Sequence, residues 1–183
     1  MALSSTIYKV DLQVSDLNRN YFAGHSLTVA QHPSETRERM LVRILVFALN
    51  ASEQLEFTRG LSTAEVPELW ETDPTGDVTH WIELGQPSMK RINRACNRCP
   101  KVSVYGYAEN RLRMWWKQNR AELSAQGRLR IVYLSAEQLG QLDTTARSLS
   151  LQCTVQDELL WFGNAQQSLE IRPEILLEHR GSD

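Results

Sequence analysis

Three glutamates, Glu38, Glu68 and Glu83, are placed where their carboxylates could act together. Glu83 ends an apolar stretch, on the same face as Trp81 and just before the turn Gly85-Gln86-Pro87. Ligands gather at the carboxyl ends of strands in α/β sheets, and carboxylate oxygens are the ligands that Mg²⁺ prefers. The pattern is typical of a metal-dependent phosphodiesterase. The alternative for Glu83 is an acid that caps the positive end of the following helix.

The partner of Glu83 can be chosen by strand geometry. Asp77 stands six residues before Glu83, or about 20 Å along an extended strand at ~3.3 Å per residue, too far to share an ion. If residues 73–77 form a hairpin turn, pairing about its centre sets residue 83 opposite residue 67, beside Glu68. Glu68 is therefore the predicted partner, unless residues 67–70 form a helical turn instead.

Glu38 is expected on the inward face of a helix. At ~100° per residue, four apolar side chains fall within about 60° of it: Leu41, Val42, Leu45 and Leu49. A buried carboxylate needs a partner, because an unpaired buried charge costs several kcal/mol. The candidates are a metal ion, backbone amides or, as the structural alternative, an arginine.

Charge is segregated along the chain, although the net charge is only −2. Residues 51–85 hold eight acids and one base, and residues 86–120 hold nine bases and one acid. Clustered Lys and Arg attract phosphates, so we expect the basic 86–120 segment to contact nucleic acid. The alternative is that the two segments are solvated faces that attract each other.

Elements of both kinds would position these residues. The predicted order is a β hairpin through residues 8–14 and 27–29, a helix over 35–50 capped by Ser34, strands over 55–60 and 79–84, a helix that begins at Pro87, a strand over 101–107, a helix over 110–123, a strand over 129–134 and a second β hairpin from 149 to Pro173. This order predicts an α/β fold with one mixed sheet flanked by helices, in a single domain over residues 1–183.

Composition excludes several other classes of protein. The chain has 183 residues, of which 42% are hydrophobic and 23% charged, as in ordinary globular domains. The N-terminus has no export signal, and the longest apolar run has six residues, against ~20 needed to span a bilayer. We expect a cytoplasmic monomer without membrane contact. Three cysteines fit a reducing compartment, and Cys96 and Cys99 are expected to be core thiols.

Several longer stretches have specific residue patterns: His32-Pro33-Ser34-Glu35-Thr36 with Glu38-Arg39-Met40, then Phe57-Thr58-Arg59-Gly60-Leu61, then Trp81-Ile82-Glu83-Leu84-Gly85 through Arg91-Ile92 and Ala95-Cys96, and Trp115-Trp116. Together they resemble the bacterial YaeQ family. The resemblance covers essentially the whole chain. It implies a compact variant of the PD-(D/E)xK, or restriction-endonuclease-like, fold, with a nuclease-like core over about residues 34–107.

The resemblance also implies roles for particular residues. Pro67-Glu68 would stand at the motif's Pro-Asp, Glu83 at its second acid and Glu38 at the helix acid of some members, the three together holding Mg²⁺. The motif's lysine is replaced by Gly85, so its place would be taken by Gln86, Lys90 or Arg91. The implied activity is a Mg²⁺-dependent nuclease. The alternative is a catalytically degenerate relative that binds nucleic acid or a protein partner without turnover.

Overall fold

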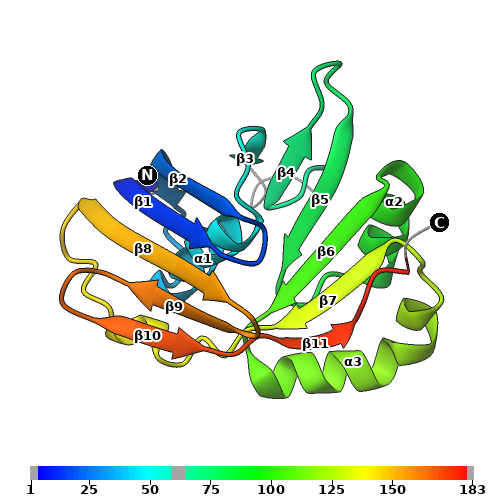
Figure 1. The fold of residues 1–183 in the computed structure, drawn as a ribbon. Helices are drawn as coiled ribbons and strands as arrows, with labels where there is room; N and C mark the ends of the chain where they lie inside the picture. The colour runs from blue at the N-terminus through cyan, green and yellow to red at the C-terminus, as the bar shows by residue number, and fades with distance from the viewer. Residues whose placement is uncertain (1–3, 59–64, 181–183) are drawn as a thin grey trace. The chain divides into compact units, whose positions relative to one another are not determined.

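The computed structural model describes residues 4–58 and 65–180, and Figure 1 shows their arrangement into sheets and helices. The strands are β1 (Thr6–Asp16), β2 (Tyr21–Gln31), β3 (Leu55–Phe57), β4 (Leu69–Thr72), β5 (Val78–Leu84), β6 (Lys101–Gly106), β7 (Leu129–Tyr133), β8 (Ser148–Gln156), β9 (Leu159–Gly163), β10 (Ser168–Ile171) and β11 (Glu174–Leu177). The helices in these residues are α1 (Arg37–Asn50), α2 (Met89–Arg98) and α3 (Glu109–Ser124), with a short 3-10 helix over Leu139–Gln141.

The chain forms two compact units, each with its own sheet. The first contains the chain up to Ala51 together with Ala136–Pro173, and the second contains Ser52–Ser135 together with the chain from Glu174 onward. The expectation of one mixed sheet was therefore wrong: the strands divide into a five-stranded and a six-stranded sheet, and each mixes parallel and antiparallel pairs. The assignment of residues 1–183 to one domain stays a prediction.

The first unit confirms the two predicted terminal hairpins and joins them. Its strand order is β10-β9-β8-β1-β2, with β1 parallel to β8 and the other pairs antiparallel. Along β1 the exposed and buried residues alternate, as the period-2 pattern of Tyr8, Val10, Leu12 and Val14 predicts. A parallel pair between the two ends of the chain cannot be inferred from local periodicity, because it depends on residues about 140 positions apart.

Helix α1 begins later than expected. Thr36, and not Ser34, is its N-cap: the Thr36 hydroxyl accepts a hydrogen bond from the Arg39 backbone N–H at 3.1 Å. Ser34 instead contacts the His32 ring, with 2.6 Å between its hydroxyl and Nδ1. The nine consecutive residues 40–48 are all buried. The helix therefore has no single inward face, which is why the stripe argument misplaced Glu38, a residue that is only half-buried.

The second unit carries most of the predicted site. Its strand order is β11-β7-β6-β5-β4-β3, in which β5, β6 and β7 are parallel and the outer strands antiparallel. Strand β3 matches the first part of the predicted 55–60 strand, whose last two residues lie outside the described ones. Strand β11 was missed, because Pro173 marked the expected end of regular structure and the strand starts immediately after it.

Apolar side chains of α2, α3 and the parallel strands form a core cluster of the second unit. The buried members are Trp81, Ile92, Ala95, Cys96, Cys99, Val102, Val104, Leu123, Leu129 and Ile131, and both Trp115 and Trp116 pack against them. Burial raises the pKa of the Cys96 thiol to about 11, so these cysteines are inert core residues, as expected. Ser88 caps α2, so Pro87 lies just outside the helix and not in its first turn.

Within residues 4–58 and 65–180, no helix is long and apolar enough to span a membrane.

Candidate functional site

Glu68 and Glu83 are brought together by the antiparallel pair of β4 and β5. Residues 73–77 form the predicted hairpin turn, in which the Asp73 N–H donates to the Asp77 carbonyl at 2.9 Å. A bulge between Glu71 and Thr72 then shifts the pairing by one residue, so that Leu69 and not Glu68 lies opposite Ile82. The predicted register was therefore wrong by one residue, although its conclusion that Glu68 is the neighbour of Glu83 holds.

Glu68 directly precedes β4 and is 8% exposed. Its backbone N–H donates to the Ile82 carbonyl at 3.1 Å, and its own carbonyl accepts from the Thr58 N–H at 3.0 Å. The segment before β4 is thus fixed between β3 and β5 as an extended chain. The helical turn over residues 67–70, which would have prevented the pairing of this segment with β5, does not form.

Glu83 is 3% exposed. Its Oε1 atom accepts two hydrogen bonds, one from a neutral indole N–H and one from a charged guanidinium. Trp81 Nε1 donates at 2.7 Å, which confirms that these residues share a face of β5, and Arg91 Nε donates at 2.6 Å. Arg91 lies in the first turn of α2, where the cap at Ser88 fixes the start of the helix. The capping turn and the left-handed Gly85, with φ of 80°, aim Arg91 back at the strand.

Arg91 also joins Glu83 to the segment that carries Glu68. Its second terminal nitrogen, Nη2, donates to the Val66 carbonyl at 2.6 Å, two residues before Glu68. The side chain of Arg91 is 20% exposed and that of Glu83 only 4%. One guanidinium therefore serves both the acid at the end of β5 and the backbone that precedes β4, an arrangement that suits the planar fork of arginine.

The pKa of Glu83 is raised. Burial is the main cause, and the nearby charge of Glu68 acts in the same direction, whereas Arg91 and Trp81 oppose the shift. Two neighbouring carboxylates in a poorly hydrated place require a cation or a proton between them. In this structure Arg91 supplies that cation to Glu83.

The other two residues proposed for the place of the missing lysine differ in their surroundings. Lys90 is exposed. Gln86 is half-buried, and its Nε2 atom is buried without a hydrogen-bond partner among the described residues. Of the predicted catalytic cations, the structure brings only Arg91 into contact with an acid of the site.

Glu38 belongs to the first unit, so its place beside Glu83 stays a prediction. The buried acid near this helix is instead Glu35, in the turn before α1. Its two carboxylate oxygens bind Arg39 Nη1 at 2.7 Å and Arg43 Nη2 at 2.8 Å. Sequence reasoning missed this cluster, although the four-residue spacing of Glu35 and Arg39 is the usual signal of an ion pair on a helix.

The residues present do not fit a magnesium ion in this conformation. Mg²⁺ needs several oxygen ligands in octahedral geometry, and one oxygen of Glu83 already accepts from Arg91 and Trp81. The described residues contain no cluster of three or more Asp, Glu, His or Cys side chains that could hold a metal. What the arrangement offers chemically is two neighbouring buried acids, of which Glu83 is ion-paired with the first turn of a basic helix.

The basic segment divides into paired and exposed cations. Arg91, Arg94 and Arg113 form ion pairs, the last two with Glu65 and Glu174 at 2.6 Å. The exposed cations of this segment without a carboxylate of the described residues at ion-pair distance are Lys90, Arg98, Arg111, Lys117 and Arg120. Arg120 also lies over the half-buried ring of Trp116, 6.0 Å from its centroid. The segment thus carries five such exposed cations, one of which lies beside an aromatic ring.

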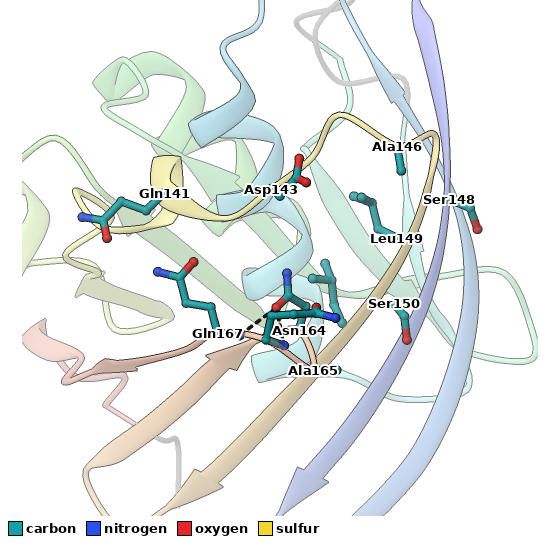
Figure 2. A pocket seen from close by; sticks show the side chains of 11 residues that line it. Gln141, Asp143, Ala146, Ser148, Leu149, Ser150, Asn164, Ala165 and Gln167 are labelled. Carbon is teal, nitrogen blue, oxygen red and sulfur yellow. Dashed lines mark hydrogen bonds between the residues drawn. The ribbon is translucent and has the colours of Figure 1, made fainter.

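A separate hollow of about 510 Å³ lies in the first unit, between the start of β8 and the loops before β8 and after β9. Figure 2 shows its lining of carboxamide and hydroxyl groups, in which Asn164 Oδ1 accepts from the backbone N–H groups of Gln166 and Gln167. Asp143 supplies a single carboxylate. None of the residues predicted from the sequence to form a site lines this hollow.

Comparison with known proteins identifies the family. The family model described as YaeQ protein matches residues 1–173. The YaeQ proteins of Salmonella typhi and Escherichia coli strain K12 are 42% and 41% identical to this chain, over 94% and 93% of its length and 96% and 95% of theirs.

Two crystal structures of YaeQ proteins have the same fold. That from Xanthomonas axonopodis pv. citri is 40% identical, with a TM-score of 0.89 over 94% of this chain and 98% of its own. That from Pseudomonas syringae is 32% identical, with a TM-score of 0.89 over 97% of this chain and 98% of its own. Sequence, length and mixed α/β architecture agree, and the chain belongs to the YaeQ family.

Proposed function

We propose that this chain is a nuclease-like protein that binds nucleic acid without hydrolysing it. The observation that carries the proposal is the contact between Arg91 and Glu83, because it fills the place where a catalytic metal ion would need a free carboxylate. The element order over residues 34–107 supports a PD-(D/E)xK-like ancestry: helix α1, strands β3, β4 and β5, helix α2 and strand β6. This is the order that the resemblance implied.

The acid pair supports binding and not catalysis. In a metal-dependent phosphodiesterase, two or three carboxylates hold the ion that activates water and clamps the phosphate. Here Glu83 is buried and bonded to Arg91, which is also bonded to the backbone at Val66. A Mg²⁺ ion bound through Glu83 Oε1 would have to displace Arg91 from that oxygen, which would leave the guanidinium without its carboxylate partner.

The residue that follows the second acid supports the same conclusion. Gly85 stands where the nuclease motif has its lysine, and its φ of 80° serves the turn into α2. A lysine there would adopt a strained left-handed backbone. The exposed Lys90 has no contact with Glu83 or Glu68 among those that the described residues make. The site therefore lacks a lysine like that of the motif, and its one contacting cation among the described residues, Arg91, is bonded to Glu83 and to the Val66 carbonyl.

The exposed cations of α2 and α3 support nucleic acid as the partner. Five of them lie within residues 90–120 without a carboxylate of the described chain at ion-pair distance. Phosphate contacts by Lys and Arg supply most of the affinity in sequence-independent binding, and a neighbouring indole can stack on an unpaired base. The half-buried Trp116 beside Arg120 fits that role.

Fluorescence anisotropy with a labelled DNA duplex and a labelled single strand of RNA tests this proposal. Each lost phosphate contact reduces the slope of log affinity against log salt concentration by about 0.9 on duplex DNA. We expect the variant Arg111→Gln, Lys117→Gln, Arg120→Gln to bind at least 10-fold more weakly and with a slope smaller by up to about 3. The matched control neutralises three exposed arginines of the first unit, Arg37, Arg147 and Arg172, and should bind as the parent does. Equal affinity of the two triple variants would refute binding through this segment.

A Mg²⁺-dependent phosphodiesterase is the second candidate. It is favoured by the two buried acids at adjoining strands and by the Nε2 atom of Gln86, three residues after Glu83, which has no hydrogen-bond partner among the described residues. In that case Glu38, Glu68 and Glu83 would hold the ion, and Gln86, Lys90 or Arg91 would supply the positive or polar group. This candidate requires Arg91 to leave Glu83, so the two functions make opposite predictions about cleavage.

A further inference from the structure

Strand β2 is an open edge of unusual length. It is the last strand of the five-stranded sheet and has eleven residues, Tyr21–Gln31, none of which is charged or a proline. The other edge strands, β10, β11 and β3, have four, four and three residues. Proteins usually protect long edges with charges, prolines or bulges, because unpaired backbone groups attract other strands. Strand β2 has none of these within its paired length.

The hydrogen-bond pattern identifies the open backbone groups. The Lys9 N–H donates to the Arg147 carbonyl next to β8, so the pair of Lys9 with Thr28 is not hydrogen-bonded. The N–H and C=O of Thr28 therefore point away from β1, and alternation gives the same direction for Phe22, Gly24, Ser26 and Ala30.

One end of this edge is already closed. Arg43 Nη2 donates to the Ala30 carbonyl at 2.8 Å. Four consecutive outward-facing residues have no backbone partner among the described residues: Phe22, Gly24, Ser26 and Thr28.

We propose that β2 pairs antiparallel with β2 of a second copy of this chain, about a twofold axis that passes beside His25. In this register Phe22 lies opposite the partner's Thr28, and Gly24 lies opposite the partner's Ser26. It is the register that uses all four open residues and leaves out Ala30. The two sheets then form one continuous ten-stranded sheet, in contrast to the monomer expected from the sequence.

The side chains suit a second copy. A strand that pairs with itself brings the residues beside the axis close to their own equivalents, so a charge there would repel its copy, and β2 has no charge. Phe22, which is 61% exposed, would lie across from a β-branched threonine, a favourable cross-strand pair. On the other face, the half-buried Tyr21 and Ala23 would lie opposite the partner's Val29 and the partner's Leu27. Every pair in this register is thus uncharged.

A cysteine at the proposed axis tests the register. Directly opposite residues of a non-hydrogen-bonded antiparallel pair have Cα atoms about 4.5 Å apart, within the range of a disulfide. We expect His25→Cys to form a disulfide-linked dimer under mild oxidation. Ala23→Cys is the matched control, because its own equivalent would be four residues away along the strand, roughly 13 Å. The natural cysteines at 96, 99 and 153 are buried and do not compete.

Sedimentation equilibrium of the full chain tests the dimer itself. We expect a mass of twice 21.0 kDa for the parent chain. Ser26→Lys, which places a charge on the open edge, should shift the equilibrium to the monomer, with an unchanged unfolding transition. Gln152→Lys, on an exposed position of the interior strand β8, should leave the dimer intact. A parent chain that is monomeric at every concentration would overturn the proposal. So would a dimer that survives Ser26→Lys, or a His25→Cys variant that cross-links no better than Ala23→Cys.

Discussion

The guanidinium of Arg91 binds the carboxylate of Glu83 at 2.6 Å, across the turn that joins β5 to α2. The two residues are eight positions apart, and the same guanidinium also holds the backbone at Val66. A basic residue of the helix thus neutralises the most buried acid of the site. The pair connects the end of β5 with the chain that leads into β4, so it is expected to support the structure as well as to exclude a metal ion.

Removal of Arg91 should destabilise the fold. Loss of one partner of a buried ion pair leaves an uncompensated charge and costs about 3 to 5 kcal/mol in other proteins; the partial exposure of Arg91 favours the lower value. We expect Arg91→Met to lower the free energy of unfolding in urea by about 3 kcal/mol. The neighbouring exposed residue gives the control, since Lys90→Met should change it by less than ~0.5 kcal/mol. Similar effects of both substitutions would show that the ion pair contributes nothing specific.

The destabilisation by Arg91→Met should be relieved when Glu83 loses its charge. Glu83→Gln removes the carboxylate that Arg91 compensates, so the double variant no longer buries an unpaired charge. A double-mutant cycle should give a coupling free energy of at least ~1 kcal/mol between the two positions. Strictly additive effects would mean that the two side chains do not act as a pair.

His80 should make stability depend on pH. It is 2% exposed and contacts Ser103 at 2.8 Å, and burial together with nearby cations lowers its pKa to about 3. Between pH 6.5 and 3 the unfolded chain therefore binds a proton that the folded chain does not. This contribution is fully present above pH 6.5 and is lost as the pH falls, by about 1.4 kcal/mol per pH unit. His80→Gln should flatten the decline of the urea midpoint between pH 7 and 5, whereas the exposed His32→Gln should keep the decline of the parent.

Ser34 and Thr36 are both suitable N-cap residues for α1 by sequence, and the structure assigns the cap to Thr36. Thr36→Ala removes the acceptor of the Arg39 N–H and should cost about 1 kcal/mol of unfolding free energy. Ser34→Ala should cost less, because Ser34 is exposed and bonds only to the neighbouring His32 among the described residues. If Ser34→Ala lowered the free energy of unfolding more than Thr36→Ala in thermal or urea unfolding, the assignment of Thr36 as the N-cap would be wrong.

Local patterns in the sequence predicted most of the elements. The alternation in β1 and the apolar spacing in α2 depend on contacts within one strand or helix, and both predictions were confirmed. The division into two sheets was missed because it depends on which distant strands pair. Strand β8 joins β1 across almost the whole chain, and no local period records that choice.

Part of the predicted candidate site comes together in the structure, but its bonding was not predicted. Glu83, Glu68 and Arg91 do come together, because a hairpin turn and a capped helix are local features that the sequence marks well. The one-residue bulge after Glu71 and the reach of Arg91 to Val66 have no signal in residue types. The burial of Glu35 instead of Glu38 follows from packing around every face of α1, which a stripe of apolar residues does not reveal.

The most direct test of the account measures binding and cleavage in the same sample. Labelled duplex DNA is incubated with the full chain in the presence of Mg²⁺, and both its anisotropy and its length are followed. The account predicts salt-dependent binding of DNA that stays intact, because Arg91 occupies the Glu83 carboxylate. Cleavage that requires Mg²⁺ and disappears in Glu83→Gln would contradict it, since such a result would show that the acid pair holds a working metal ion.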